Sequence, residues 1–278
     1  MKSPKEASQI DIMSAHPCFS DEAHARVGRI HLPVAPRCDI RCAFCERNFC
    51  AALEIRHPGW TAKLLSVTEA VDLIRSVMRS RQAANPFVVG VAGPGDPLSN
   101  DETFEAIGQI HNEYPHLLKC VSTNGLLLED KLQCIIDVGI RAMTVTVNAA
   151  NSQIGKGIYL WVSYRGTVYR GEEAASLLLE KQFNGIRKAA NAGLKVKVNT
   201  VLIPGVNDSN MPELAMRIKE AGGIMMNIMP LIPSGRMRDL PSPSCDELRK
   251  ARLECENIIP QFHLCQQCRA DIIYLPNL

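Results

Sequence analysis

The chain has 278 residues, which is enough for one large domain or two small ones with an ample hydrophobic core. Its 46% hydrophobic and 22% charged residues are those of an ordinary globular protein, and a formal charge of +2 indicates neither nucleic acid nor an anionic membrane as partner. Eleven cysteines, no apolar leader after Met1 and no apolar run of membrane-spanning length argue against a secreted disulfide scaffold. We therefore expect a cytoplasmic protein whose reduced thiols bind metal.

The pattern of polar and apolar residues divides the chain into elements. Residues 1–15 are polar and are expected to form a mobile tail. Runs rich in apolar and β-branched residues predict six strands, at residues 29–35, 87–92, 119–123, 141–147, 195–203 and 224–231. Helical periodicity and capping-box spacing predict the helices between them, at residues 66–78, 103–112, 128–138, 172–192, 212–221 and from 244 onward.

Alternating strands and helices with short connections predict a parallel α/β sheet with right-handed crossovers. A doubly wound sheet and a barrel are both compatible with this alternation. No repeat, linker or low-complexity segment divides residues 16–278, so we expect them to form a single domain. In a barrel, the functional side chains would lie at the carboxyl ends of the strands.

Three cysteines follow the first predicted strand with the spacing C-x3-C-x2-C, at Cys38, Cys42 and Cys45. A short loop with this spacing can turn three thiolates toward one point, and thiolates are the usual ligands of iron–sulfur clusters and zinc. Three ligands on a [4Fe–4S] cluster leave one iron open. A zinc site, or chance spacing in a cysteine-rich chain, is the alternative interpretation.

This motif after a first strand resembles that of the radical S-adenosylmethionine (SAM) enzymes, whose open iron chelates the methionine end of SAM. Several further segments together resemble the NifB family within that superfamily. They read H-L-P-V-A-P-R-C at 31–38, V-A-G-P-G-D-P-L at 91–98, C-V-S-T-N-G-L at 120–126, K-V-N-T-V-L-I-P-G-V-N-D at 197–208, N-I-M-P-L-I at 227–232 and C-Q-Q-C-R-A-D at 265–271. The resemblance implies a partial (β/α)6 TIM-like barrel with N- and C-terminal extensions that carry cluster ligands, and a stand-alone form without a C-terminal extra domain.

The resemblance also implies a SAM site at the ends of strands two to four. The segment with Gly93, Gly95 and Asp96 would hold the amino group of SAM. Hydrogen bonds to the ribose or carboxylate would come from four residues: Ser122, Thr123, Asn124 and Asn148. Each of these residue types is equally suited to an ordinary turn or cap.

Two further [4Fe–4S] clusters, the substrates that NifB proteins fuse, are implied as well. Six thiol and imidazole side chains outside the loop would hold them. The division we predict is His31, Cys50 and Cys120 for one cluster, and Cys18, Cys265 and Cys268 for the other. The remaining cysteines fall on predicted helices and are expected to be core thiols: Cys134, Cys245 and Cys255.

The segment after the cysteine loop departs from the family pattern C-N-R-x-x-D-C-x-N-E-S-R-P-G. Glu54 and Arg56 stay in register with the family's E-x-R, which makes them candidates for proton handling at the cluster. Cys50 falls one residue early, and His57 stands where proline is expected. The shift would turn Cys50 to another face of an extended segment, although a loop could absorb it.

Three functions remain open. The first is a NifB-type enzyme that fuses two [4Fe–4S] clusters, with a SAM-derived carbide and an extra sulfur, into the eight-iron precursor of the nitrogenase cofactor. Its partners would be SAM, a cluster donor, an electron donor and a carrier or scaffold protein of nitrogenase maturation. The second is a radical SAM enzyme that acts on an organic or peptide substrate with auxiliary clusters, and the third is a non-catalytic iron–sulfur scaffold.

Overall fold

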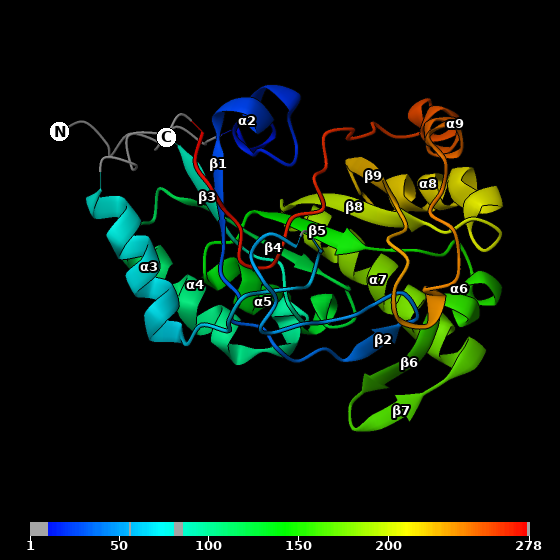
Figure 1. Ribbon diagram of the computed structural model, residues 1–278, viewed down its shortest axis with the longest axis horizontal. Coiled ribbons are helices and arrows are strands. Elements are labelled where there is room, and N and C mark those ends of the chain that lie inside the picture. The colour runs from blue at the N-terminus through cyan, green and yellow to red at the C-terminus, as the bar shows by residue number, and fades with distance from the viewer. Residues whose placement is uncertain (1–10, 56, 81–85, 277–278) are drawn as a thin grey trace.

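The computed structural model describes residues 11–55, 57–80 and 86–276. Six parallel strands form a curled sheet in chain order, and a short antiparallel strand extends its first edge (Figure 1). Across the sheet the strands are β10 (Ile273–Tyr274), β1 (Gly28–His31), β3 (Phe87–Val91), β4 (Leu118–Thr123), β5 (Ala142–Thr146), β8 (Lys195–Leu202) and β9 (Met225–Pro230). Sequential order without a reversal distinguishes a partial (β/α)6 barrel from the doubly wound alternative.

The predicted helices are confirmed, with small shifts at their ends. Capping boxes begin two of them, at Ser66 with Glu69 and at Ser244 with Glu247. The helices that follow the strands are α3 (Val67–Arg79), α4 (Asp101–Glu113), α5 (Leu128–Asp137), α7 (Gly171–Asn191), α8 (Met211–Glu220) and α9 (Cys245–Glu256). Their apolar faces bury residues such as Ile74, Ile107 and Leu178 against the outside of the sheet.

Several short elements lie outside the predicted alternation. A second sheet combines β2 (Ile40–Cys42) with a hairpin of β6 (Tyr159–Tyr164) and β7 (Thr167–Tyr169). The other unpredicted elements are α1 (Ile12–Ala15), α2 (Asp21–Arg26), α6 (Ser152–Ile158) and three single 3-10 turns at 97–99, 208–210 and 235–237. Part of the expected tail, residues 12–15, is therefore a helical turn.

The amino-terminal mouth of the barrel is covered by α2. Its Ala23 and the following Val27 pack against Val88 of β3, with Leu118 of β4 beside them. No helix among the described residues is long and apolar enough to cross a membrane.

The C-terminal segment, residues 257–276, spans the open side of the half-barrel. It joins the last strand where the Met226 N–H donates to Pro260 O and the Phe262 N–H donates to Met226 O. It then reaches the first strand, where Ile273 and Tyr274 pair with β1 (Figure 1). The segment thus links the two edges of the sheet that the barrel leaves unpaired.

Candidate functional site

One cavity opens at the carboxyl ends of the strands and gathers most of the predicted site residues. Eight of the nine predicted metal ligands line it: Cys18, His31, Cys38, Cys42, Cys45, Cys120, Cys265 and Cys268. Six of the seven predicted SAM-contacting residues also line it: Gly95, Asp96, Ser122, Thr123, Asn124 and Asn148. Gly93, Cys50 and Glu54 do not line this cavity.

The cysteine loop is positioned by three separate parts of the chain. β2 pairs antiparallel with β6, and the Ala43 N–H donates to Ile158 O at 2.8 Å. On the other side, the Ser234 hydroxyl donates to Phe44 O and the Arg236 N–H donates to Ala43 O. The unpredicted hairpin and the 235–237 turn therefore hold the loop at the mouth of the barrel.

The Gly-Pro-Gly-Asp segment also supports the loop. The Gly95 N–H donates to Ala35 O at 2.6 Å, and the Asp96 N–H donates to Arg37 O at 2.7 Å. A Cβ on Gly95 would collide with the Arg37 carbonyl. This glycine is needed because two stretches of backbone meet closely, whereas the sequence suggested a close approach by a ligand.

The three loop thiols are buried together. Burial, and then the nearby Asp96 carboxylate, raise the pKa of Cys38 to about 12. Burial and the neighbouring thiols raise the pKa of Cys42. Burial also raises the pKa of Cys45, although the positive charges of Arg47 and Arg41 lower it in part. Metal must therefore displace a proton from each thiol on binding.

No three His, Cys, Asp or Glu side chains in the described ranges lie close enough together to hold a single metal ion. A four-iron cluster differs from a single ion because it distributes its ligands over separate irons.

Asp96 is engaged by its own chain. Its carboxylate accepts from the Thr123 hydroxyl at 2.9 Å, the Leu98 N–H at 2.9 Å and the Asn124 N–H at 2.5 Å. Burial and the nearby Asp39 raise its pKa to about 7. Asp96 therefore fixes the end of β4 against the loop after β3.

One further polar side chain has a free hydrogen-bonding atom at the cavity. The Asn148 Oδ1 accepts from the Val201 N–H, while its Nδ2 is buried without a partner in the described structure. The Asn124 Nδ2, in contrast, donates to Asp39 Oδ1 at 2.6 Å. A donor on Asn148 thus remains for a ligand in the cavity.

His31 and Cys120 face each other across a glycine. A Cβ on Gly90 would lie 2.9 Å from the Cys120 Sγ and 3.4 Å from the His31 ring. The ring nitrogen His31 Nδ1 lies 3.1 Å from Arg269 O, to which it donates in one tautomer. Burial lowers the pKa of His31 to about 4, so its ring is neutral near pH 7, with Nε2 free to bind metal.

Cys265 and Cys268 reach the cavity because the C-terminal segment crosses it. Burial, opposed by the charge of Arg29 and reinforced by the thiols of Cys18 and Cys265, raises the pKa of Cys268 to about 11. Burial and the charge of Cys18 also raise the pKa of Cys120 to about 12. Cys18 therefore lies near thiols from both predicted ligand sets, and the two sets share one space.

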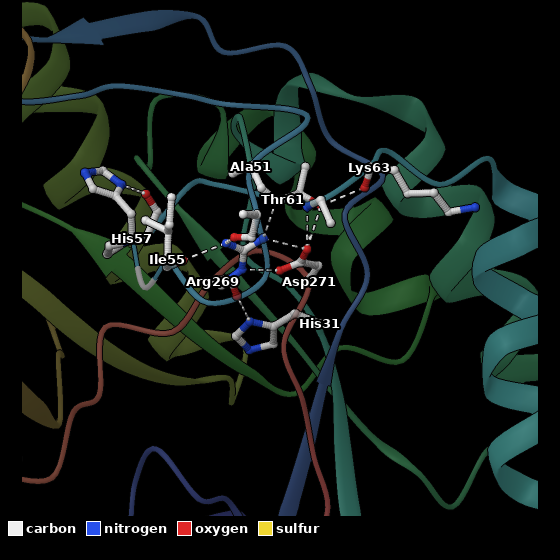
Figure 2. Close-up of polar contacts among 11 residues, drawn as sticks. His31, Ala51, Ile55, His57, Thr61, Lys63, Arg269 and Asp271 are labelled. Carbon is white, nitrogen blue, oxygen red and sulfur yellow. Dashed lines mark hydrogen bonds and ion pairs between the residues drawn. The ribbon is translucent and has the colours of Figure 1, made fainter.

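Arg269 connects this segment to the loop after the cysteine motif, residues 46–62 (Figure 2). Its guanidinium donates to both carboxylate oxygens of Asp271, at 2.8 and 3.0 Å. It also donates to Ala52 O at 2.9 Å and Ile55 O at 2.6 Å, while the Ala62 N–H donates to Asp271 at 2.6 Å. The pair therefore fixes residues 51–62 against the segment that carries Cys265 and Cys268.

The same loop carries the predicted residues that stay outside the cavity. Cys50 is exposed, and both its N–H and its Sγ interact with Asn48 Oδ1. Glu54 is exposed as well. Arg56 lies outside the described residues.

Comparison with known proteins identifies the family of this chain. The radical SAM superfamily model matches residues 32–218. The FeMo cofactor biosynthesis protein NifB of Methanocaldococcus infernus is 44% identical over 95% of this chain and 86% of its own length. The chain belongs to the NifB family. NifB of Klebsiella pneumoniae is 40% identical over 95% of this chain and 57% of its own, longer sequence. A radical SAM methyltransferase of Sphaerobacter thermophilus, 18% identical over 85% of this chain and 64% of its own, shares the fold with a TM-score of 0.56.

Membership of the radical SAM superfamily implies a [4Fe–4S] cluster and SAM. The residues present fit both groups. Three thiols of the C-x3-C-x2-C loop face the cavity, and the free Asn148 Nδ2 offers a hydrogen-bond donor in the same cavity.

Some cavity residues were not predicted from the sequence. His16 is buried in the cavity wall with its Nε2 unpartnered. Asp39, within the cysteine motif itself, does not line the cavity but accepts a hydrogen bond from the lining residue Asn124. Two sequence features could have indicated these residues. His16 stands two residues before the predicted ligand Cys18, and Asp39 lies between the ligand cysteines Cys38 and Cys42. Other cavity residues that were not predicted include Thr144, Thr146, Tyr159, Lys197, Asn199 and Met229.

The prediction that the helix cysteines are core thiols is right for Cys255 and wrong for two others. Cys255 is fully buried, whereas Cys134 and Cys245 are exposed. Both exposed thiols lie on the solvent side of their helices, because α5 and α9 bury other positions, such as Ile135 and Ala251.

Proposed function

We propose that this NifB-family chain acts in the biosynthesis of the nitrogenase FeMo cofactor. In this proposal it fuses two [4Fe–4S] clusters, with a SAM-derived carbide and an extra sulfur, into an eight-iron precursor. The observation that carries the proposal is the cavity that the three loop cysteines share with five of the six further predicted thiol and imidazole ligands. The matching relatives are named for FeMo cofactor biosynthesis, which supports the same reading.

The first part of the proposal is SAM cleavage at the cysteine loop. Cys38, Cys42 and Cys45 would hold the cluster, which when bound supplies the electron for reductive cleavage of SAM. The free Asn148 Nδ2 would donate to the carboxylate or ribose of SAM. Ser122 would lie beside it in the cavity wall. Residues 93–96 and 123–124 would fix the strand ends around the ligand through the Asp96 hydrogen bonds.

The second part concerns the substrate clusters. His31, Cys50 and Cys120 would hold one of them, with His31 binding through Nε2 because Nδ1 donates to Arg269 O. The space left by Gly90 between His31 and Cys120 supports this placement. Cys50 can take part only if residues 46–62 move so that its exposed thiol enters the cavity. The same movement would bring in Glu54 and its neighbour Arg56, which we propose for proton handling.

The other substrate cluster would be held by Cys18, Cys265 and Cys268. All three line the cavity, and they come from the two ends of the described chain. We propose that residues 16–278 form one radical SAM domain and that these two extensions complete it. The partners in this proposal are SAM, a cluster donor, an electron donor and a carrier or scaffold protein of nitrogenase maturation, in the cytoplasm and without nucleic acid or membrane.

An anaerobic experiment with two readouts tests the proposal. Reconstituted protein should carry about twelve irons per chain, as three four-iron clusters require. After incubation with reductant and SAM labelled at its methyl carbon, the label should remain in an acid-labile iron–sulfur product on the protein. About four irons per chain, or a methyl label recovered only in small organic products, would contradict it.

A further inference from the structure

Two basic side chains are buried at the cavity: Lys197 lines it, and Arg29 lies beside the lining residue Cys268. Arg29 of β1 is 1% exposed and Lys197 of β8 is 2% exposed. Arg29 precedes His31 by two residues on its strand, so both point to the same face, toward the barrel interior. Among the described residues, neither Arg29 nor Lys197 forms an ion pair with a carboxylate. Asp271, whose charge acts on His31 as that of Arg29 does, is already paired with Arg269.

The contacts of the two cations leave donor capacity unused. The Lys197 Nζ donates to Cys18 O at 2.9 Å and lies over the rings of Phe19 and Phe262. The Arg29 Nη2 donates to Gln266 Oε1 at 2.6 Å. Its Nε and Nη1 are buried and have no hydrogen-bond partner in the described structure. Buried guanidinium N–H groups in folded proteins normally donate to a hydrogen-bond acceptor. The Nε and Nη1 of Arg29 therefore lack the acceptor that such groups normally have.

The surrounding groups supply no compensating anion. The Arg29 guanidinium contacts the Gln266 side-chain amide and lies over the ring of Tyr274. The Lys197 ammonium contacts the Cys18 carbonyl and the rings of Phe19 and Phe262. None of these groups carries a negative charge. A buried charge without a counter-charge is strongly unfavourable, which points to an anionic ligand.

We propose that Arg29 and Lys197 are the counter-charges of the iron–sulfur substrate held by Cys18, Cys265 and Cys268. The Nε and Nη1 of Arg29 donate to sulfur atoms of that substrate, beside Cys268. Lys197 faces the same substrate across Cys18. This inference rests on the proposed function. A thiolate-ligated four-iron cluster is an anion whose reduction potential depends on nearby charge and on hydrogen bonds to its sulfurs, so both residues position the substrate and tune its potential.

The test compares Arg29→Met and Lys197→Met with Lys119→Met in the full-length reconstituted protein. Lys119 is a matched control because it is an equally buried lysine on another strand of the same sheet, β4, but its Nζ bonds to His111, Tyr114 O and Pro115 O away from the cavity. Two quantities are measured: the rate at which a chelator removes iron, and the reduction potentials of the auxiliary clusters by anaerobic titration with paramagnetic resonance detection.

We expect Arg29→Met and Lys197→Met to lose the auxiliary iron at least about tenfold faster than wild type, as the loss of a charge-assisted hydrogen bond implies. We also expect more negative auxiliary potentials, with the loop cluster unchanged. Arg29→Lys should restore most of the potential because it restores the charge. Lys119→Met should match wild type in both measurements.

Other outcomes separate this inference from the proposed function. A wild-type protein with about twelve irons, and variants with unchanged iron loss and potentials, would overturn the inference and leave the function standing. A lower Tm in Arg29→Lys or Lys197→Met, with unchanged reduction potentials of the auxiliary clusters, would identify a purely structural role for these residues. That result would also overturn the inference. A wild-type protein with iron only in the loop cluster would overturn both.

Discussion

Replacing Arg269 by methionine should both destabilise the protein and release the loop of residues 46–62. The Arg269 and Asp271 side chains are only 8% and 14% exposed, so solvent screens this pair little. Arg269→Met leaves the Asp271 carboxylate with two remaining donors. It leaves the Ile55 carbonyl without its donor and the Ala52 carbonyl with the Ile55 N–H alone. Removing one partner of a buried pair costs about 3–5 kcal/mol, and we expect a loss of that size in the free energy of unfolding.

The local consequence can be measured by amide hydrogen exchange. The Ala51 N–H donates to Thr61 O, the Thr61 N–H to Asn48 O and the Ala270 N–H to Trp60 O, so these amides report whether the loop stays closed. A local destabilisation of about 3 kcal/mol corresponds to exchange that is roughly a hundredfold faster. The control is Arg249→Met, which breaks an exposed pair with Asp246 and should change stability by less than about 1 kcal/mol.

The effect should depend on pH with a defined sign. Burial alone would raise the pKa of Asp271, but hydrogen bonds from Arg269 and the Ala62 N–H hold it below its usual range. The stabilisation is therefore complete above the unfolded pKa of about 4 and is lost as the pH falls through the lower folded pKa. The difference between wild type and Arg269→Met should shrink in that acidic range. Unchanged exchange at Thr61 and a stability loss below about 1 kcal/mol at pH 7 would refute this account of the loop.

Three further predictions concern the cavity. Replacing Cys38, Cys42 and Cys45 together by alanine should abolish formation of 5′-deoxyadenosine while iron remains bound elsewhere; continued formation under strong reductant would exclude this loop as the SAM site. Asp96→Ala should weaken SAM binding without changing the iron content, because it releases Thr123 and the Asn124 N–H at the strand end, and an unchanged dissociation constant would count against that role. Cys265→Ala with Cys268→Ala should leave SAM cleavage measurable and eliminate the eight-iron product, whereas the exposed Cys134→Ser and Cys245→Ser controls should retain it.

The local parts of the fold were predictable from the sequence. Ser66 and Ser244 begin helices because capping-box chemistry acts within four residues, and the buried strands are continuous apolar runs. The hairpin of β6 and β7 was missed. Its short strands carry polar and aromatic residues, and they follow a short helix that contains Gly155 and Gly157. The segment therefore shows neither a sustained helical period nor a sustained strand alternation of apolar residues.

Contacts between distant parts of the chain set the rest of the site. The family resemblance predicted Cys265 and Cys268 as ligands of a substrate cluster, and the structure places both in the cavity of the cysteine loop. Local pattern could not show that their segment crosses from β9 to β1. Gly95 was read as leaving space for a ligand, whereas the Arg37 backbone fills that space. Arg29 and Lys197 gave no local signal, because a basic residue in a strand normally indicates a solvent-facing position.

The measurement that tests the central claim most directly is activation of cofactor-deficient nitrogenase. Reconstituted protein would be incubated anaerobically with SAM and reductant, and then mixed with that nitrogenase and the other maturation proteins. We predict substrate reduction that depends on this chain and on SAM, and that is lost in the Cys265→Ala, Cys268→Ala variant. A wild-type protein that cleaves SAM and carries all three clusters, yet fails to activate nitrogenase, would contradict carbide insertion and favour a radical SAM enzyme with an organic or peptide substrate.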